Sequence, residues 1–309
     1  MIAAANNQKA VLALGGGGAR GVAHLGVIQV LREVPIEIER YVGVSIGSLA
    51  GALCAVDDDC DRVQLKVVEY LTSEEFQHKQ AELFLAAPEA DEPAVSGLFA
   101  WYHQIRKYIG ARRKLATVFS KPALLEASVM QDVVDALIPD IDIQDATIPL
   151  SIVALDLYSG KKVVLTEGSL KQAVMASAAI PGVFPPVKWH DMLLCDIGMM
   201  DAVPARIAKS YGSPLTIAVD VSGIVEPIDK CETAGDIFVR LYDISEPLVR
   251  EYTRGIADLL ICPDVSHMPW YDFSDPAALI QLGREAAQGF LVDQTTASQE
   301  RFGTVPVRR

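Results

Sequence analysis

The chain has 309 residues, half of them hydrophobic, and a formal net charge of −13 at pH 7. Such an acidic balance argues against nucleic acid as a partner, because nucleic-acid-binding proteins cluster Lys and Arg to neutralise phosphates. The five cysteines are scattered and form no Cys-x-x-Cys pair. We therefore expect reduced thiols and neither a metal site nor a redox site.

Residues 1–9 contain no basic, apolar leader, and no run of about 18 or more apolar residues occurs anywhere in the chain. These two observations predict a cytoplasmic protein without a membrane-spanning helix. Contact with a membrane is then expected to be peripheral.

The first part of the chain predicts two strand-turn-helix units in succession. Residues 9–14 form a short apolar run that ends in glycines, and residues 20–34 carry apolar side chains at helical spacing. Residues 40–44 then predict a buried strand, and residues 46–56 predict a helix of small residues. Two such units in a row favour a mainly parallel sheet with helices on its faces.

The rest of the chain predicts a helical insertion followed by further strands and helices. Residues 61–139 are helix-like almost throughout, with breaks at prolines. The apolar runs 148–158 and 161–167, joined by Ser159-Gly160, predict a hairpin, so we expect a mixed sheet. Later helices are expected at 170–179, 202–211, 234–254 and from 276 onward, and later strands at 192–195, 215–221 and 258–262.

Ser45 lies in the pattern Gly43-Val44-Ser45-Ile46-Gly47, between a predicted strand and a predicted helix. A Gly-x-Ser-x-Gly turn of this kind exposes the serine hydroxyl above a sheet, and its small residues let the strand and helix approach closely. The helix that follows points its positive dipole end at developing negative charge. Ser45 is therefore a candidate nucleophile, although a tight turn in any α/β protein can carry the same pattern.

Gly16 to Gly21 match the pattern Gly-x-Gly-x-x-Gly, which often binds a dinucleotide. A dinucleotide site also needs an acidic residue at the end of the second strand, where this chain has Ser45. We expect instead that the backbone amides of Gly17 and Gly18 form an oxyanion hole. Arg20 is expected either to orient this loop or to bind an anionic head group.

A serine nucleophile needs a proton acceptor within hydrogen-bonding reach. None of the histidines suits this role, because His24 lies on a predicted helix, His190 beside a predicted turn, and His267 at no predicted strand end. A carboxylate used directly is the remaining solution, and Asp196 follows the predicted strand 192–195. Three further aspartates stay open as alternatives: Asp156, Asp201 and Asp220.

Four segments taken together resemble the patatin-like phospholipase family, in particular its bacterial members akin to the catalytic region of neuropathy target esterase. These segments are residues 14–26, 43–48, 176–186 and 196–204. Their order and spacing agree with the family over residues 10–56 and 148–211.

The resemblance implies a three-layer α/β/α fold with a mainly parallel, mixed sheet. A single domain is then expected over residues 1–309, with a core at 9–60 and 145–222, the helical insertion at about 61–139, and C-terminal helices and a strand at 223–309. No metal or cofactor is implied.

The implied activity is hydrolysis of acyl esters in phospholipids or lysolipids through an acyl-serine intermediate. Carried over by position, Ser45 is the nucleophile, Asp196 activates it, and Gly16, Gly17 and Gly18 hold the oxyanion. Residues that support these motifs are Arg20, Gly21, Gly43, Gly47 and Gly198. Two alternatives remain: a transacylase on the same residues, and a family member that binds lipid without turnover.

Ile197 departs from the family pattern, which usually has glycine after the aspartate. A β-branched residue is costly if this position needs a positive φ angle. In that case the Asp196 carboxylate would be displaced, and a shift of about 1 Å can slow catalysis roughly a hundredfold.

The insertion carries one apolar stripe at helical spacing with basic residues beside it. The stripe consists of Leu98, Trp101, Tyr102, Ile105, Tyr108 and Ile109. Such a helix could lie in a membrane interface, where Trp101, Tyr102 and Tyr108 would make the peripheral contact, or cover an acyl channel. A helix that packs on the core shows the same pattern.

Overall fold

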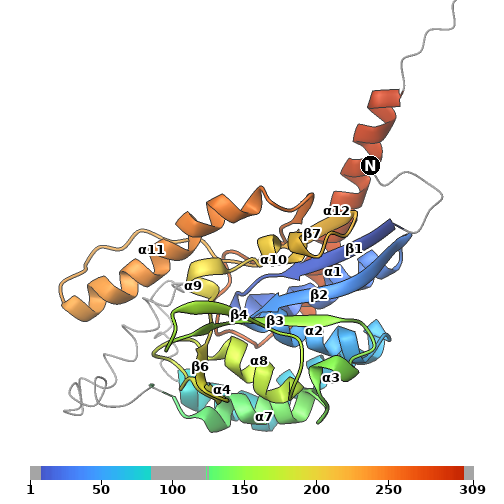
Figure 1. Ribbon diagram of the computed structural model, residues 1–309. Helices are drawn as coiled ribbons and strands as arrows, with labels where there is room; N and C mark the ends of the chain where they lie inside the picture. The colour runs from blue at the N-terminus through green and yellow to red at the C-terminus, as the bar shows by residue number, and fades with distance from the viewer. Residues whose placement is uncertain (1–7, 85–122, 124, 303–309) are drawn as a thin grey trace, which may run out of the picture.

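The computed structural model describes residues 8–84, 123 and 125–302 of the chain (Figure 1). The stripe expected in the insertion, with Trp101, Tyr102 and Tyr108, lies outside the described residues. The described part of the insertion contains α3 (Cys60–Leu71), α4 (Glu74–Phe84) and α7 (Ala127–Leu137). It is helical, as the sequence predicts.

The centre of the described structure is a mixed eight-stranded sheet. Its strands are β1 (Gln8–Leu14), β2 (Ile36–Val44), β3 (Leu150–Asp156), β4 (Lys161–Leu165), β5 (Val187–Trp189), β6 (Met192–Cys195), β7 (Leu215–Val219) and β8 (Leu259–Ile261). They lie in the order β5-β6-β3-β2-β1-β7-β8, and β4 pairs with β3. The pairs β3-β2, β2-β1, β1-β7 and β7-β8 are parallel. The pairs β3-β4, β3-β6 and β5-β6 are antiparallel. The predicted hairpin is β3 and β4.

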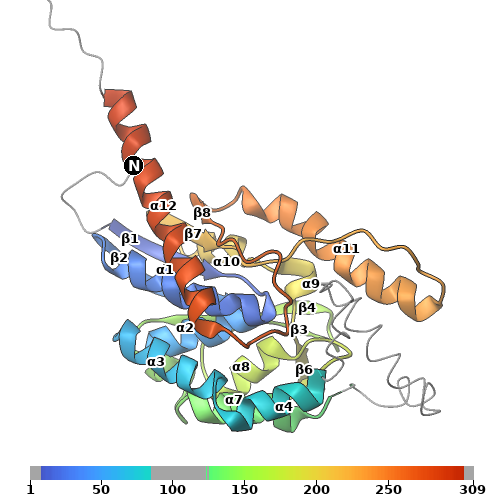
Figure 2. The same ribbon diagram turned by 180° about the vertical axis from the view of Figure 1, so that it is seen from behind.

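Helices cover both faces of the sheet, which gives three layers (Figures 1 and 2). One face carries α1 (Ala23–Arg32), α2 (Ile46–Val56), α8 (Leu170–Ala178) and α12 (Pro276–Phe302), with α3 and α7 outside them. The other carries α9 (Gly198–Asp201), α10 (Ala205–Ser210) and α11 (Ala234–Arg254). Side chains alternate along β1, so that Leu12 and Leu14 join one core and Val11 and Ala13 the other.

The structure differs from the sequence prediction at three elements. β2 begins at Ile36, because Ile36 and Ile38 point into the core while Glu37 is exposed. The short strand β5 pairs with β6 through a turn in which His190 has a φ of 51°. The helix predicted at 202–211 is α10 and begins later, since Pro204 precedes it with a non-helical ψ of 41°, and the short helix α9 before it is not predicted.

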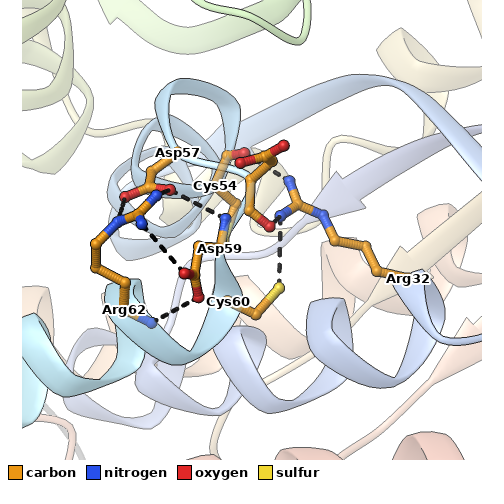
Figure 3. Close-up of polar contacts among 7 residues, drawn as sticks. Arg32, Cys54, Asp57, Asp59, Cys60 and Arg62 are labelled. Atoms are coloured by element: carbon orange, nitrogen blue, oxygen red, sulfur yellow. Dashed lines mark hydrogen bonds and ion pairs between the residues drawn. The ribbon is translucent and has the colours of Figure 1, made fainter.

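The C-terminal end of α2 is held by the guanidinium group of Arg32 (Figure 3). Arg32 donates to the carbonyl oxygens of Cys54 at 2.6 Å and Asp58 at 2.7 Å, and to the Tyr41 hydroxyl at 3.0 Å. A second cluster beside it is formed by Arg62, Asp57 and Asp59. A cation that binds the last carbonyls of a helix stabilises this end, so the helix that follows Ser45 is anchored at its far end.

Among the described residues, no helix combines the length and the apolar character that crossing a membrane requires.

Candidate active site

Ser45 stands at the turn between β2 and α2, in a conformation that non-glycine residues rarely adopt. Its φ is 54° and its ψ is −127°. The turn needs glycines on both sides: a Cβ at Gly43 would lie 2.5 Å from the Cα of Ser48, and one at Gly47 would lie 2.3 Å from the carbonyl oxygen of Leu14. The predicted elbow is therefore present, and its backbone strain is of the kind that clusters at functional sites.

Ser177 holds this turn in place. The backbone N–H of Ser45 donates to the Ser177 hydroxyl at 2.9 Å, and that hydroxyl donates to the Val153 carbonyl at 2.7 Å. Ser177 is fully buried on α8, so water does not compete for these bonds. Sequence reasoning did not assign it a role, although it lies in one of the segments that resemble the family.

Asp196 follows β6 and faces Ser45. Its carboxylate accepts a hydrogen bond from the Gly198 amide at 2.6 Å, and the Ser45 side chain interacts with it and favours its charged form. Only 5% of Asp196 is exposed, and this burial raises its pKa to about 6 against the opposing effect of these two groups. The aspartate is thus a stronger base than an exposed one.

Ile197 does not strain this arrangement. Its φ is −96°, so it lies outside the positive-φ region where a β-branched residue would be costly. The side chain is buried in the core that also contains Val44, Val153 and Val203. The condition under which Asp196 would be displaced, a positive φ angle at residue 197, is therefore not met.

The three alternative aspartates have other partners. Asp156 accepts from the amides of Leu193, Tyr158 and Ser159 and so closes the β3–β4 turn. Asp201 forms an ion pair with Lys162. Asp220 accepts from the Ser222 amide and from Arg250. Of the four aspartates, Asp196 is the one that lines the same cavity as Ser45 and interacts with its side chain.

The three histidines considered from the sequence are not placed to act as the base. His24 is completely buried and donates from Nε2 to the Gly15 carbonyl at 2.8 Å, which supports the glycine loop. Burial lowers its pKa to about 4, so it is neutral. His190 and His267 are exposed. Within the described ranges, no three His, Cys, Asp or Glu side chains gather where a metal could be held.

The glycine loop passes directly beside Ser45. A Cβ at Gly16 would lie 3.3 Å from the Cβ of Ser45. The Gly16 amide donates to the Ala202 carbonyl at 2.9 Å, so this geometry does not support Gly16 as an oxyanion donor. The amides of Gly17 and Gly18 bind no acceptor among the described residues, and both glycines line the cavity next to Ser45.

Two further glycines of the loop are required by close packing. Gly18 has a φ of 60°, and a Cβ there would lie 2.2 Å from the Trp270 carbonyl oxygen. A Cβ at Gly21 would lie 2.1 Å from Cγ2 of Ile46, the first residue of α2. The loop is therefore held against α2 on one side and against Trp270 on the other.

Arg20 is buried between this loop and the C-terminal part of the chain. Its Nε donates to the Met268 carbonyl at 2.6 Å, and its guanidinium group lines the cavity beside Ser45. Burial lowers its pKa to about 10, an effect that the nearby Glu246 carboxylate opposes. Arg20 thus orients the loop and also faces the cavity, so both expected roles remain.

Two cavities of about 150 Å³ each meet at Ser45. The polar cavity is lined by Arg20, Asp196, Arg240, Tyr242, Asp243 and Glu246, among others. The apolar cavity is lined mainly by hydrophobic side chains of α2, α3, α7 and α8. Both are bordered by Gly18, Ser45, Ile180 and Trp270. The hydroxyl therefore stands between a charged compartment and an apolar one.

The walls of the polar cavity include residues that the sequence did not reveal. Tyr242 and Glu246 come from α11, and Trp270 comes from the loop before α12. Burial raises the pKa of Tyr242 well above its usual value and that of Glu246 to about 7. No motif marks these residues, because only the packing of α11 beside α9 brings them to Ser45.

Comparison with known proteins identifies the family. The model of the patatin-like phospholipases matches residues 12–209, which include Ser45 and Asp196. The chain belongs to the patatin-like phospholipase family. Tyr242, Glu246 and Trp270 lie beyond the matched residues.

The similar family members include an uncharacterized NTE family protein of Mycobacterium tuberculosis. It is 31% identical over 218 residues, which cover 71% of this chain and 50% of that protein. Human patatin-like phospholipase domain-containing protein 6 is 28% identical over 212 residues, covering 68% of this chain and 13% of that protein. The chain thus matches half or less of these relatives. The crystal structure of VipD from Legionella pneumophila covers 94% of this chain and 67% of VipD, with a TM-score of 0.43 and 14% identity.

Proposed function

We propose that this chain is a lipid acyl hydrolase in which Ser45 is the nucleophile and Asp196 is the general base. The observation that carries the proposal is that the buried Asp196 carboxylate and Ser45 line one cavity, with Ser45 at a positive-φ turn and its side chain favouring the ionised carboxylate. Membership of the patatin-like phospholipase family supports a lipid ester as the substrate.

In the first half of the reaction, Ser45 Oγ attacks the ester carbonyl carbon, and its proton passes to the Asp196 carboxylate. The negative charge that develops on the carbonyl oxygen is stabilised by the amides of Gly17 and Gly18. The tetrahedral intermediate collapses when the bond to the alcohol oxygen breaks. The alcohol leaves with the proton from Asp196, and an acyl-Ser45 ester remains.

In the second half, a water molecule attacks the acyl-Ser45 carbonyl carbon while Asp196 takes one of its protons. Collapse of this intermediate breaks the bond to Ser45 Oγ, which recovers the proton from Asp196, and the fatty acid is released. A pKa of about 6 suits both steps. The carboxylate is ionised at neutral pH, yet it accepts a proton more readily than an exposed aspartate.

The proposal is tested by fluorophosphonate labelling and by hydrolysis of a soluble carboxylic ester. We expect Ser45→Ala to lose labelling and activity, and Asp196→Asn to lose activity by about 10²–10⁴-fold, the usual range for a general base. Ser210→Ala, on the exposed end of α10, is the matched control and should behave as wild type. Activity retained in Ser45→Ala would overturn the proposal. Product identification with added glycerol shows whether water or an alcohol accepts the acyl group.

A further inference from the structure

The apolar cavity begins at Ser45, and most of its walls come from α2, α3, α7 and α8, with smaller contributions from α1 and α4. Its walls include Ile46, Leu49, Ala50 and Leu53 of α2, Val67 and Leu71 of α3, Met130, Val133, Val134 and Leu137 of α7, and Val174 and Ala178 of α8. Lys79 is the charged residue in its described lining, and its ammonium group is paired with Glu75 and Asp132. This cavity therefore offers a bound molecule almost exclusively apolar surface.

We propose that the apolar cavity is an acyl-chain site. It binds one hydrocarbon chain that extends from Ser45 along α2, and the cavity thereby determines which chain lengths are preferred. The proposal rests on the proposed function, because it places the carbonyl carbon of the same ester at Ser45. It adds a binding site for saturated chains of about ten carbons or more.

The direction of the chain follows from the spacing of the α2 residues that line the cavity. Ser45, Leu49 and Leu53 recur every four residues and so lie on one face of the helix. A rise of 1.5 Å per residue places Leu49 about 6 Å and Leu53 about 12 Å from Ser45 along the axis. An extended chain advances about 1.25 Å per carbon for tetrahedral single bonds of about 1.5 Å. Leu49 is therefore about five carbons from the carbonyl, and Leu53 about ten.

The contrast between the two cavities decides which part of the ester each one receives. A hydrocarbon chain in the polar cavity would cover the charged side chains of Arg240, Asp243 and Glu246 without supplying hydrogen bonds, which is unfavourable. In the apolar cavity, each buried methylene improves binding by about fourfold. The acyl chain thus occupies the apolar cavity and the alcohol part occupies the polar one.

The test uses p-nitrophenyl esters with saturated acyl chains of two to sixteen carbons, kept below their solubility limits. For wild type we expect kcat/KM to rise with chain length to at least about ten carbons. Leu49→Trp should end this rise near five carbons, and Leu53→Trp near ten, because the indole blocks the chain one or two helical turns from Ser45. Leu65→Trp is the matched control, since Leu65 is 58% exposed on α3 and outside the cavity lining. It should keep the wild-type profile.

Equal cut-offs in Leu49→Trp and Leu53→Trp, or wild-type profiles in both, would overturn the acyl-chain site while leaving the proposed function intact. Failure of the proposed function has a different signature, namely hydrolysis of all chain lengths by Ser45→Ala. Folding of each variant is checked by thermal melting. If a tryptophan variant does not fold, the wild-type protein still decides: alkyl fluorophosphonates should inactivate it faster with a dodecyl than with an ethyl chain, and equal rates would contradict the proposal.

Discussion

The ionisation of Asp196 links its burial to the chemistry of the site. The Ser45 side chain and the Gly198 amide both favour its charged form. Desolvation outweighs them, so the pKa lies at about 6. The same shift makes ionised Asp196 unfavourable for the fold. The free energy of unfolding therefore includes the full contribution of Asp196 below pH 3.8, the pKa of this group in the unfolded chain. That contribution is lost as the pH rises through about 6, the pKa in the folded protein.

We expect the activity to fall below pH 6. The general base must be ionised, so kcat/KM for a soluble ester should decrease about tenfold per pH unit once the pH is below the pKa of Asp196. Initial rates between pH 4.5 and 8.5, at substrate concentrations well below KM, measure this limb. A rate that stays constant down to pH 4.5 would contradict the role of Asp196, provided that the circular dichroism spectrum shows a folded protein throughout.

At the scale of residues, turn chemistry marked Ser45 as a candidate nucleophile, whereas the assignment of Asp196 came from the family resemblance. The elbow is a local pattern, since Gly43, Ser45 and Gly47 act within a few positions of one another. The position of the proposed base depends on pairing far along the chain: β6 joins β3 and thereby brings Asp196 to the cavity beside Ser45. Periodicity and turn chemistry contain no information on that contact, so four aspartates stayed open.

Among the elements, α1 and α12 cross at close range through a pair of glycines. A Cβ at Gly26 would lie 1.9 Å from the Ile280 carbonyl oxygen, and one at Gly283 would lie 1.9 Å from the Ala23 carbonyl oxygen. No flexible side chain stands at these contacts, so an added methyl group must move a helix backbone. Because α1 carries His24, which supports the glycine loop, this crossing also positions the catalytic candidates.

We expect Gly283→Ala to lower the free energy of unfolding by about 1–3 kcal/mol, the usual range for an overpacked core. Gly289→Ala is the matched control on the same helix. Nothing lies within 4 Å of a Cβ at Gly289, so alanine should raise the free energy of unfolding by up to about 1 kcal/mol through its higher helix propensity. Urea denaturation of the two variants measures the difference. Equal effects of the same sign would show that the crossing is not as close as described.

Most elements could be predicted from periodicity, because helices such as α2 and strands such as β1 have buried faces that repeat regularly. β5 was not predicted because its three residues include the exposed Lys188 and directly follow Pro185-Pro186, whereas the equally short β8 is a run of leucine and isoleucine. α9 was not predicted because its four residues span little more than one helical turn and so show no periodicity. Elements are thus predictable where their own sequence decides their conformation, and less so where a turn or a partner strand decides it.

At the scale of the whole molecule, a net charge of −13 affects encounters with lipid surfaces. An acidic protein is repelled by an anionic surface, and salt screens this repulsion over a Debye length of about 10 Å at 0.1 M. The polar cavity does not change this balance, since its arginines stand beside Asp243 and Glu246.

We therefore expect faster hydrolysis of a neutral ester in zwitterionic vesicles than in vesicles containing anionic lipid at low salt. The difference should narrow as the salt concentration is raised to about 0.5 M, where the Debye length becomes a few ångströms. Release of fatty acid from the two vesicle compositions measures it, and a soluble ester serves as the control for direct effects of salt. A preference for anionic vesicles would instead indicate a basic docking surface.

The position of Trp270 has a further consequence for how such a protein can diversify. Its carbonyl binds the Ala19 amide next to the glycine loop, and the residue borders both cavities, yet it lies beyond residue 209, where the match to the family model ends. With α11, it belongs to a stretch that shares no motif with the nucleophile and its base. Under the proposed function, mutations accumulating in that stretch would alter which alcohol is released while Ser45 and Asp196 stay unchanged. Substrate choice and chemistry can thus evolve at different rates within one gene.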